Sequence, residues 1–345
     1  MQAAVLDAPR ALSIRDVGMP DLPDGAVLVR VELAGVCGSD LKLWRFGSPR
    51  LRLPAVIGHE VVGRVEAAPA ACRHLRGQRV VTIIDVPCFQ CPACRQARYN
   101  LCDQGRAIGW EVPGGFAEFL AIPSETVAAG GVLTVPEGLR AEEAVLAEPV
   151  GCAVRGQEAA GVGPEDTVLV IGAGPMGYLH ACLSRLRGAR RVILCDLLAR
   201  RLQQTAEAPV DARLVVGDGF ERIVRDLTEA RGGPDVVIVA AATASAQDLA
   251  VRLAAKRGRV NFYASLPAGE AGRFDINPIH NRELRVVATR NATIGAMQAA
   301  LGLLAAGRLP TAPLVAAVEP FAHLPDLFAR FDDAQILKPI VAVTR

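Results

Sequence analysis

A glycine-rich turn that follows an apolar run most constrains how this chain of 345 residues can fold. The run Val-Leu-Val-Ile leads directly into Gly172, Gly174 and Gly177, with Pro175 and Met176 between the last two. In such a turn the first glycine permits a tight bend, the second admits a pyrophosphate, and the third lets a helix lie close to the sheet. We therefore expect a strand, this turn, and a helix whose amino end binds a dinucleotide.

Apolar strands alternate with amphipathic helices around this turn, which predicts an α/β fold with a doubly wound parallel sheet. We assign this Rossmann-type domain to residues 151–289. Residues 1–150 carry short β-like runs separated by Gly- and Pro-containing turns, so they predict a β-rich domain. Residues 290–345 do not continue the alternation and are expected to return to the first domain. The expected strands of the parallel sheet are 167–171, 192–195, 214–216, 236–240 and 260–263.

An acidic residue indicates which dinucleotide is bound. Asp196 ends the strand after the turn, nineteen residues beyond Gly177. Its carboxylate can accept hydrogen bonds from a ribose hydroxyl and would repel a 2′-phosphate, so NAD is expected in preference to NADP. Arg200 and Arg201 follow and complicate this preference. The alternative role for Asp196 is a solvated helix cap.

Four cysteines mark a loop in the first half of the chain: Cys88, Cys91, Cys94 and Cys102. Structural zinc takes four thiolates in a tetrahedron, and tight Cys-x-x-Cys turns supply them with little backbone strain. Nine cysteines in a chain without an export signal argue against a disulfide framework. We expect residues 88–102 to form a lobe ordered by zinc; buried thiols, redox thiols and an iron–sulfur cluster are the alternatives.

Overall charge and hydropathy exclude several classes of function. A net charge of +2 gives no general reason to bind nucleic acid or a membrane surface. Asp7 and Pro9 interrupt the first ten residues, where an export signal needs an apolar stretch. Glycines, a proline and His180 interrupt the most apolar later stretch, so no membrane span is expected. We predict a cytoplasmic protein that acts on a small molecule.

Three further fragments carry groups that can bind zinc: Cys37, His59 with Glu60, and Glu148. Each fragment alone is a weak signal, but together they offer a thiolate, an imidazole and carboxylates. Glu148 falls in an otherwise apolar helix, where a carboxylate is costly unless it is paired or bound to a metal. A second, catalytic zinc is therefore expected, which gives two zinc ions per chain.

These motifs, in this order and over nearly the whole chain, resemble the zinc-containing medium-chain dehydrogenase/reductase superfamily. Glu60 and the Ala-Glu-Pro segment at Glu148 are most similar to its sorbitol (iditol) and threonine dehydrogenase branch. The resemblance implies a GroES-like catalytic domain before the Rossmann domain. It also implies a homo-oligomer, a tetramer or a dimer, that oxidises a secondary alcohol of a polyol, cyclitol or sugar derivative with NAD.

The resemblance also implies roles for single residues. Hydride leaves a carbinol carbon readily only when the oxygen on that carbon has alkoxide character. Zinc can supply this character, because it lowers the pKa of bound water from about 15.7 to about 7, which is equivalent to about 12 kcal/mol of anion stabilisation. Ser39 is placed to take the alcohol proton, although a turn residue is the plain alternative. By resemblance, the catalytic zinc is bound by Cys37, His59 and one or both of Glu60 and Glu148. Asp40 is expected to hydrogen-bond His59 from behind. Arg201 is expected beside the adenosine, and Arg290 at the substrate hydroxyls or at Glu148.

Two residues that differ from the family pattern, and one arginine-containing loop, leave the identity of the substrate undetermined. Lys42 stands where many relatives have a histidine that ends a proton relay, and Leu43 replaces a tyrosine that contacts substrate. Residues 44–52 contain three arginines that either attract a phosphate or carboxylate of the substrate or form a solvated loop. A threonine-type dehydrogenase and a dehydrogenase of sugar phosphates or acids are therefore alternatives. The non-enzymatic alternative is an NAD-binding redox sensor, although such a sensor does not require an open zinc site.

Overall fold

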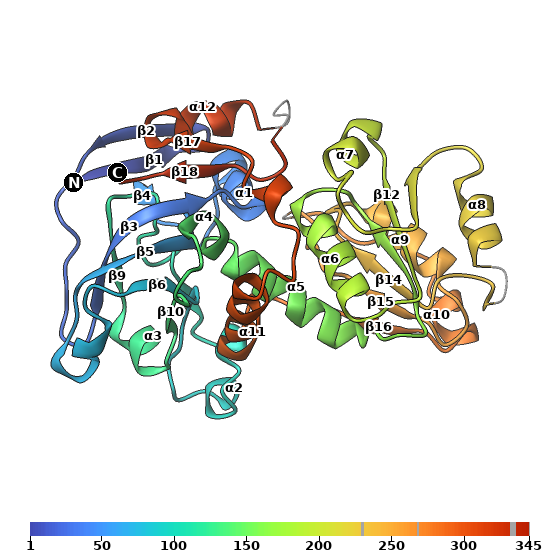
Figure 1. The fold of residues 1–345 in the computed structure, drawn as a ribbon, viewed down its shortest axis with the longest axis horizontal. Helices are drawn as coiled ribbons and strands as arrows, with labels where there is room; N and C mark the ends of the chain where they lie inside the picture. Colours follow the sequence, from blue (N-terminus) through green and yellow to red (C-terminus); the bar gives the residue numbers. More distant parts are fainter. Residues whose placement is uncertain (229–230, 268, 332–335, 345) are drawn as a thin grey trace. The chain divides into compact units, whose positions relative to one another are not determined.

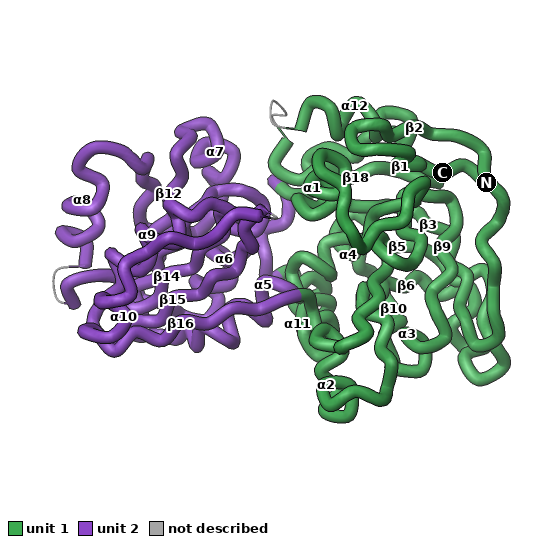
Figure 2. Tube along the Cα trace, turned by 180° about the vertical axis from the view of Figure 1, so that it is seen from behind, with its two compact units in different colours: residues 1–151, 291–307, 314–345 green, residues 152–290, 308–313 purple. Residues whose placement is uncertain are grey.

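The computed structural model describes residues 1–228, 231–267, 269–331 and 336–344. The chain divides into two compact units, drawn in different colours in Figure 2. Each unit has its own apolar core. Unit 1 comprises residues 1–151, 291–307 and 314–345, and unit 2 comprises residues 152–290 and 308–313. Helix α5 (Ala147–Ala160) begins in unit 1 and ends in unit 2.

Unit 2 is built on a parallel sheet with the strand order β13-β12-β11-β14-β15-β16. Figure 1 labels β12, β14, β15 and β16 of this sheet. The order reverses at β11, and doubly wound sheets bind their ligands beyond the carboxyl ends of the strands at this point. The expected α/β fold is confirmed. The strands are β11 (Thr167–Ile171), β12 (Arg191–Asp196), β13 (Ala212–Val215), β14 (Val236–Val239), β15 (Arg259–Asn261) and β16 (Arg285–Val287). The helices are α6 (Pro175–Leu186), α7 (Ala199–Gln204), α8 (Phe220–Leu227), α9 (Ala244–Leu253) and α10 (Asn277–Asn281).

The strands at the centre of this sheet are buried on both faces. Every residue of β11 and β14 is buried, which explains why they read as continuous apolar runs rather than as alternating ones. Leu169 and Val237 pack in one core with Phe220 of α8 and Leu249 of α9. The helices thus cover apolar strands that could not be exposed, and the turn after β11 is held on a rigid base.

Unit 1 is rich in antiparallel strands. Its largest sheet has the order β10-β6-β5-β3-β18-β17, with β9 also paired to β3. Strand β18 (Ile340–Ala342), near the end of the chain, pairs antiparallel with β3 (Val27–Gly35), so the last segment completes a sheet begun near the start. The other strands are β1 (Gln2–Ala8), β2 (Ala11–Asp16), β4 (Ala55–Val56), β5 (Glu60–Ala67), β6 (Arg79–Thr82), β7 (Asp85–Val86), β8 (Arg106–Ala107), β9 (Phe119–Ile122), β10 (Val132–Thr134) and β17 (Val318–Pro320). The helices are α1 (Gly38–Phe46), α2 (Pro92–Arg95), α3 (Ser124–Ala128), α4 (Ala141–Ala144), α11 (Ile294–Ala305) and α12 (Leu324–Ala329).

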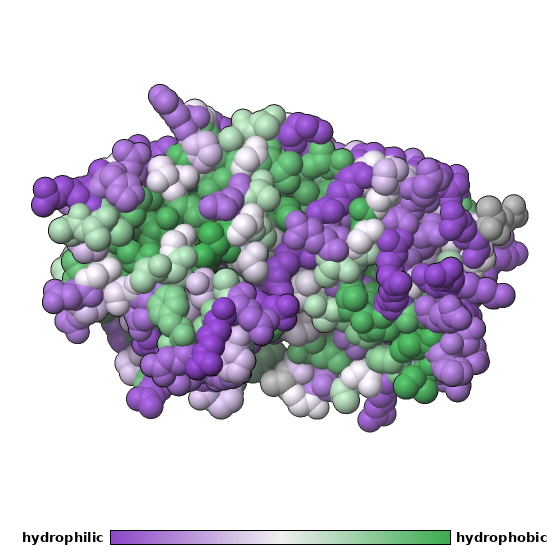
Figure 3. Space-filling model, turned by 90° about the horizontal axis from the view of Figure 1, so that it is seen from below, coloured by the Kyte–Doolittle hydropathy of each residue, from purple (hydrophilic) through white to green (hydrophobic). Residues whose placement is uncertain are grey.

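Apolar and hydrophilic residues are interspersed on the face of the molecule drawn in Figure 3. Apolar atoms contribute more than half of the accessible surface of a folded protein, so exposed residues such as Phe46 and Ile276 are ordinary. Among the described residues, no helix combines the length and the apolar character that crossing a bilayer requires.

Candidate active site and cofactor turn

Three of the expected zinc ligands lie together in unit 1. Cys37 precedes α1, His59 immediately precedes β5 and Glu60 is its first residue. One ligand atom from each lies within 4.8 Å of the others. His59 and Glu60 are 3% and 1% exposed. A thiolate, an imidazole and a carboxylate at this spacing suit a zinc ion. Glu148, on α5, is buried but is not part of this mutually close group within the described chain.

Asp40 connects two of these ligands. Its Oδ2 accepts a hydrogen bond from the backbone N–H of Cys37 at 2.9 Å, and its Oδ1 lies 3.1 Å from Nδ1 of His59. When Nδ1 carries the proton, His59 donates to Asp40 and keeps the Nε2 lone pair for a metal. Burial has the largest single effect and lowers the pKa of His59, but the charge of Asp40, its hydrogen bond and the neighbouring Cys37 together outweigh burial and hold this pKa well above its ordinary value. The structure thus brings Asp40 and His59 into the contact that the resemblance implies.

Lys338 belongs to this site although nothing in the sequence analysis pointed to it. The side chain is 4% exposed; its Nζ forms an ion pair with Glu60 and donates to the carbonyl oxygen of Val36 at 2.9 Å. Gly35 makes room for the carboxylate, because a Cβ at this position would lie 2.2 Å from Glu60 Oε2. Burial lowers the pKa of Lys338, but Glu60 and then Cys37 raise it, and the result is above the ordinary value.

Trp110 is a second residue that sequence reasoning missed. Its ring centroid lies 4.9 Å from that of His59, with the two rings inclined at 47°. The indole therefore covers one side of a candidate zinc ligand and limits how water reaches it. A single tryptophan in a loop gives no sequence signal for such a contact, because tryptophan is also a common core residue.

The remaining candidates of unit 1 lie along α1. Ser39 and Lys42 are half-buried in its first turns, and Leu43 is 4% exposed within the apolar core of unit 1.

Arg290 is exposed, belongs to unit 2, and accepts a hydrogen bond at its backbone carbonyl from Arg155. The substrate role of Arg290 stays a prediction.

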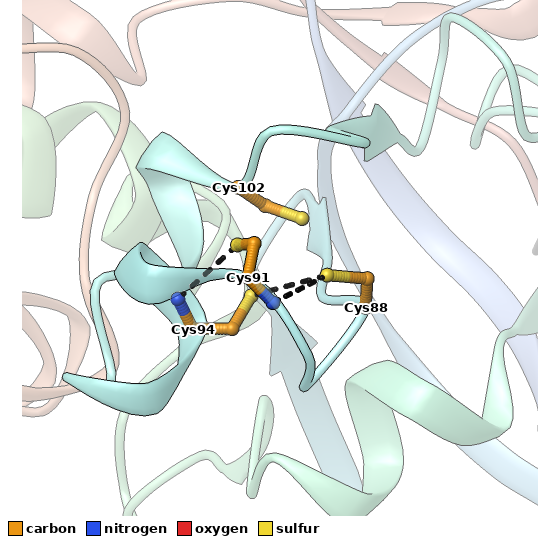
Figure 4. Close-up of side chains that lie close together, drawn as sticks. All are labelled: Cys88, Cys91, Cys94 and Cys102. Atoms are coloured by element: carbon orange, nitrogen blue, oxygen red, sulfur yellow. Dashed lines mark hydrogen bonds between the residues drawn. The ribbon is translucent and has the colours of Figure 1, made fainter.

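The four cysteines of the lobe converge around α2 (Figure 4). All four are free thiols, and Sγ of Cys88 lies 4.0 Å from Sγ of Cys94. Sulfurs that bind one zinc ion at about 2.3 Å in a tetrahedron lie about 3.8 Å apart, so the lobe fits a metal. Backbone hydrogen bonds, first from Asp103 and then from Cys94, lower the pKa of Cys91 to about 6, which favours the thiolate that a metal requires.

The turn after β11 has the backbone that its glycines predict. Gly172 has φ +105°, and a Cβ on Gly177 would lie 1.7 Å from the carbonyl oxygen of Gly172. Asp196, at the end of β12, accepts hydrogen bonds from the backbone N–H of Ala173 at 2.8 Å and of Leu198 at 2.9 Å. The carboxylate is therefore fixed beside the turn and is not a freely solvated cap.

Other cofactor candidates surround this turn. Gly174 precedes α6, in which Pro175 is the first residue and Met176 the second, and a Cβ on Gly174 would lie 3.2 Å from Nη1 of Arg201. A cavity of about 270 Å³ in unit 2 is lined by Gly172 and Asp196, among others. It lies at the carboxyl ends of β11 and β12, where sheets of this order bind dinucleotides.

Known proteins share this combination of units. The model of the alcohol dehydrogenase GroES-like domain matches residues 23–136, and that of the zinc-binding dehydrogenase matches residues 175–306. L-galactonate-5-dehydrogenase of Escherichia coli K12 is 27% identical over 99% of this chain and 98% of its own. Erythritol/L-threitol dehydrogenase of Mycolicibacterium smegmatis is 32% identical over 75% of each chain. L-threonine 3-dehydrogenase of Sinorhizobium medicae is 33% identical over 61% of each chain.

Solved structures agree with these relatives. A zinc-binding dehydrogenase of Sinorhizobium meliloti, solved with NADP, is 31% identical, covers 99% of this chain and 98% of its own, and has a TM-score of 0.90. The alcohol dehydrogenase rspB of Escherichia coli CFT073, solved with NADH, is 26% identical over 99% of both chains, with a TM-score of 0.88. Zinc and NAD(P) are therefore the cofactors of this protein. The chain belongs to the zinc-dependent medium-chain dehydrogenase/reductase superfamily, in its sorbitol and threonine dehydrogenase branch, and is an NAD(P)-linked alcohol dehydrogenase.

Proposed function

We propose that this enzyme oxidises a secondary alcohol of a polyol, cyclitol or sugar derivative to a ketone and transfers the hydride to NAD. The observation that carries the proposal is the buried group of Cys37, His59 and Glu60, with Asp40 behind His59. Relatives named for L-galactonate and for erythritol support the substrate class.

The residues of unit 1 have separable tasks in this reaction. A zinc ion held by Cys37, His59 and one or both of Glu60 and Glu148 would lower the pKa of a substrate alcohol, as it lowers that of water. The Ser39 hydroxyl would accept the proton of the substrate hydroxyl while its own proton passes to solvent, and bound NAD would supply the acceptor for the hydride of the carbinol carbon. The carbon loses two electrons with the hydride and becomes the ketone.

The preference for NAD rests on Asp196. Its carboxylate is fixed beside the glycine turn, where it would bind a ribose hydroxyl and repel a 2′-phosphate. Arg201 lies beside Gly174 and contributes positive charge at the adenosine end. A second zinc, bound in the lobe of residues 88–102, completes two ions per chain.

Two alternatives concern the substrate. Similarity to L-threonine 3-dehydrogenase supports an amino-acid side-chain alcohol, although it covers only 61% of this chain. Sugar acids and sugar phosphates are the other alternative, since one relative is named for L-galactonate.

We also propose that the enzyme is a cytoplasmic homo-oligomer, either a tetramer or a dimer. Sedimentation velocity would determine its oligomeric state.

An NADH-formation screen of the purified, zinc-loaded enzyme tests the proposal. The panel contains alditols, cyclitols, aldonates, sugar phosphates and hydroxy amino acids, each with NAD and with NADP. We expect the highest kcat/KM for a polyol or sugar derivative with NAD. Turnover confined to threonine, or to NADP, would contradict the corresponding part of the proposal.

A further inference from the structure

Unit 1 contains a cavity of about 630 Å³ that none of the roles assigned above uses. Its wall is formed by β1, β2, the segment 50–56 and the segment 106–113. Its volume is within the range of about 300–1,000 Å³ that is typical of small-molecule sites. It is therefore large enough for part of a sugar-sized ligand.

The wall of this cavity is strongly basic. Four arginines and one carboxylate line it: Arg15, Arg50, Arg52, Arg106 and Glu111. Three of the arginines are engaged in ion pairs, Arg15 with Asp7, Arg50 with Glu111 and Arg106 with Glu125. Arg52 is exposed, and within the described parts of the chain it has neither an ion pair nor a hydrogen bond from its guanidinium.

The local sequence explains why Arg52 is left available. Leu51 is 7% exposed and anchors the segment in the core of unit 1. Arg50 is held by Glu111 and by the carbonyl oxygen of Gly105, which its Nη2 approaches to 2.8 Å. The same segment thus presents one arginine that braces the wall and one that is free to bind a ligand.

Trp110 links the cavity to the candidate zinc site. It lines the cavity, and its ring packs against His59, with the ring centroids 4.9 Å apart. Its neighbour Glu111 is fixed by Arg50 and also accepts a hydrogen bond from the backbone N–H of Ala107 at 3.0 Å. Trp110 therefore lies between this cavity and one of the candidate metal ligands.

We propose that this cavity binds an anionic group of the substrate, a carboxylate or a phosphate, through Arg52. This inference rests on the proposed function and narrows its substrate class to acidic polyol derivatives. A guanidinium without another partner can bind either anion through two parallel hydrogen bonds. A neutral alditol would leave this arginine unused.

The test compares three matched classes of substrate: six-carbon alditols, the corresponding aldonates and the corresponding alditol phosphates. For the wild type and Arg52→Gln, KM and kcat are measured by NADH formation. We expect Arg52→Gln to raise KM at least about tenfold for the preferred anionic class, equivalent to about 1.4 kcal/mol, with kcat nearly unchanged. The KM for alditols should not change, and Arg52→Lys should recover part of the loss.

Arg76→Gln is the matched control, because it removes the same charge from an exposed arginine of unit 1 outside the cavity. It should leave every KM unchanged. The comparison of aldonate with phosphate shows which anion the cavity prefers. The inference would be overturned if Arg52→Gln and the wild type had equal KM values, or if the KM rose equally for alditols and anionic substrates. The proposed function would still stand in either case, provided that the enzyme oxidises alditols. If the wild type oxidises neither these three classes nor cyclitols, the proposed function itself is wrong.

Discussion

At the residue scale, one carboxylate sets the arrangement of two metal ligands. Asp40 is fully buried and uses one oxygen for the backbone of Cys37 and the other for the ring of His59. The loop before α1 and the start of β5 are therefore held at a fixed separation even without a metal. Outer partners of this kind typically contribute 10- to 100-fold to metal affinity.

Replacing Asp40 tests this role. Asp40→Asn keeps the shape of the side chain but supplies only one acceptor oxygen where two are used, so we expect the affinity of the catalytic zinc to fall about 10- to 100-fold. Competition with a fluorescent chelator measures this affinity. Asp7→Asn, in an exposed ion pair with Arg15, is the control and should leave it unchanged. Equal affinities in both variants would refute the role of Asp40.

Lys338 allows a prediction about stability. Lys338→Met leaves the buried carboxylate of Glu60 without its cation, and breaking a buried pair in this way costs about 3–5 kcal/mol. Urea unfolding of the zinc-free protein should show this loss. The double variant Lys338→Met with Glu60→Gln should recover most of it, because no charge is then buried alone. Equal stability losses in the single and double variants would contradict this interpretation of the pair.

Sequence reasoning identified the ligands and Asp40 behind His59, but not the supports that come from distant parts of the chain. Cys37, His59 and Glu60 lie in short motifs, whereas Lys338 reaches Val36 from 302 positions away. Only folding brings β18 beside β3 and places this lysine at the site. Trp110 likewise meets His59 through a loop whose path no local pattern predicts.

At the scale of elements, α5 and α6 are joined in unit 2 by a buried polar contact. His180 on α6 is fully buried; its Nδ1 lies 3.2 Å from Nε2 of Gln157 on α5, which also donates to Ser184 Oγ at 3.0 Å. Burial lowers the pKa of His180 to about 3. The folded state therefore holds the neutral ring over the whole neutral pH range.

This pKa predicts a pH dependence of stability. The unfolded chain takes up a proton below about pH 6.5 and the folded chain does not, so the contribution is complete above that pH and is lost as pH falls toward 3. Between pH 7.5 and 5.5 the wild type should lose about 1.4 kcal/mol more unfolding free energy than His180→Asn. Urea unfolding at both pH values measures the difference. Identical pH dependence in the two proteins would show that His180 titrates normally.

The cysteine lobe is an element that a metal should order. It contains only a short helix and a few buried side chains, and structural zinc supplies about 10–16 kcal/mol in small zinc peptides. Cys91→Ser should therefore lower the zinc content from two ions per chain to one and make residues 88–102 sensitive to protease. Cys72→Ser, at a free cysteine elsewhere in unit 1, is the control. Two retained zinc ions in Cys91→Ser would contradict the assignment of the lobe.

Elements with strong patterns were predictable, and weakly patterned ones were not. The strand expected at 167–171 is β11, and the strand expected at 260–263 begins one residue earlier and ends two earlier, at Asn261. Strand β2 was missed, because it is mostly exposed or half-buried and its apolar residues do not form a run. Strand β1 was also missed, although its residues 3–6 are apolar and buried. Buried parallel strands can be recognised from the sequence because their residues form continuous apolar runs. The position of an edge strand is determined mainly by pairing with strands elsewhere in the chain, which the local sequence does not show.

At the scale of the whole molecule, the motifs are spread from residue 35 to residue 196, and their order indicated the family. The fold class and the alcohol dehydrogenase activity are confirmed. The functional division at residues 1–150, 151–289 and 290–345 stays a prediction. Unit 1 holds the candidate metal ligands and unit 2 the glycine turn, so removal of one site should spare the other.

The rate of NADH formation by Cys37→Ala, with the best polyol substrate at saturation, tests this account most directly. Removing the thiolate takes one ligand from the catalytic zinc, so kcat should fall at least about 1,000-fold, equivalent to about 4 kcal/mol. NADH binding to the glycine turn of unit 2 should stay within about twofold of the wild type, which excludes a folding defect. A Cys37→Ala enzyme that kept kcat within about tenfold of the wild type would contradict the zinc site as the centre of the reaction.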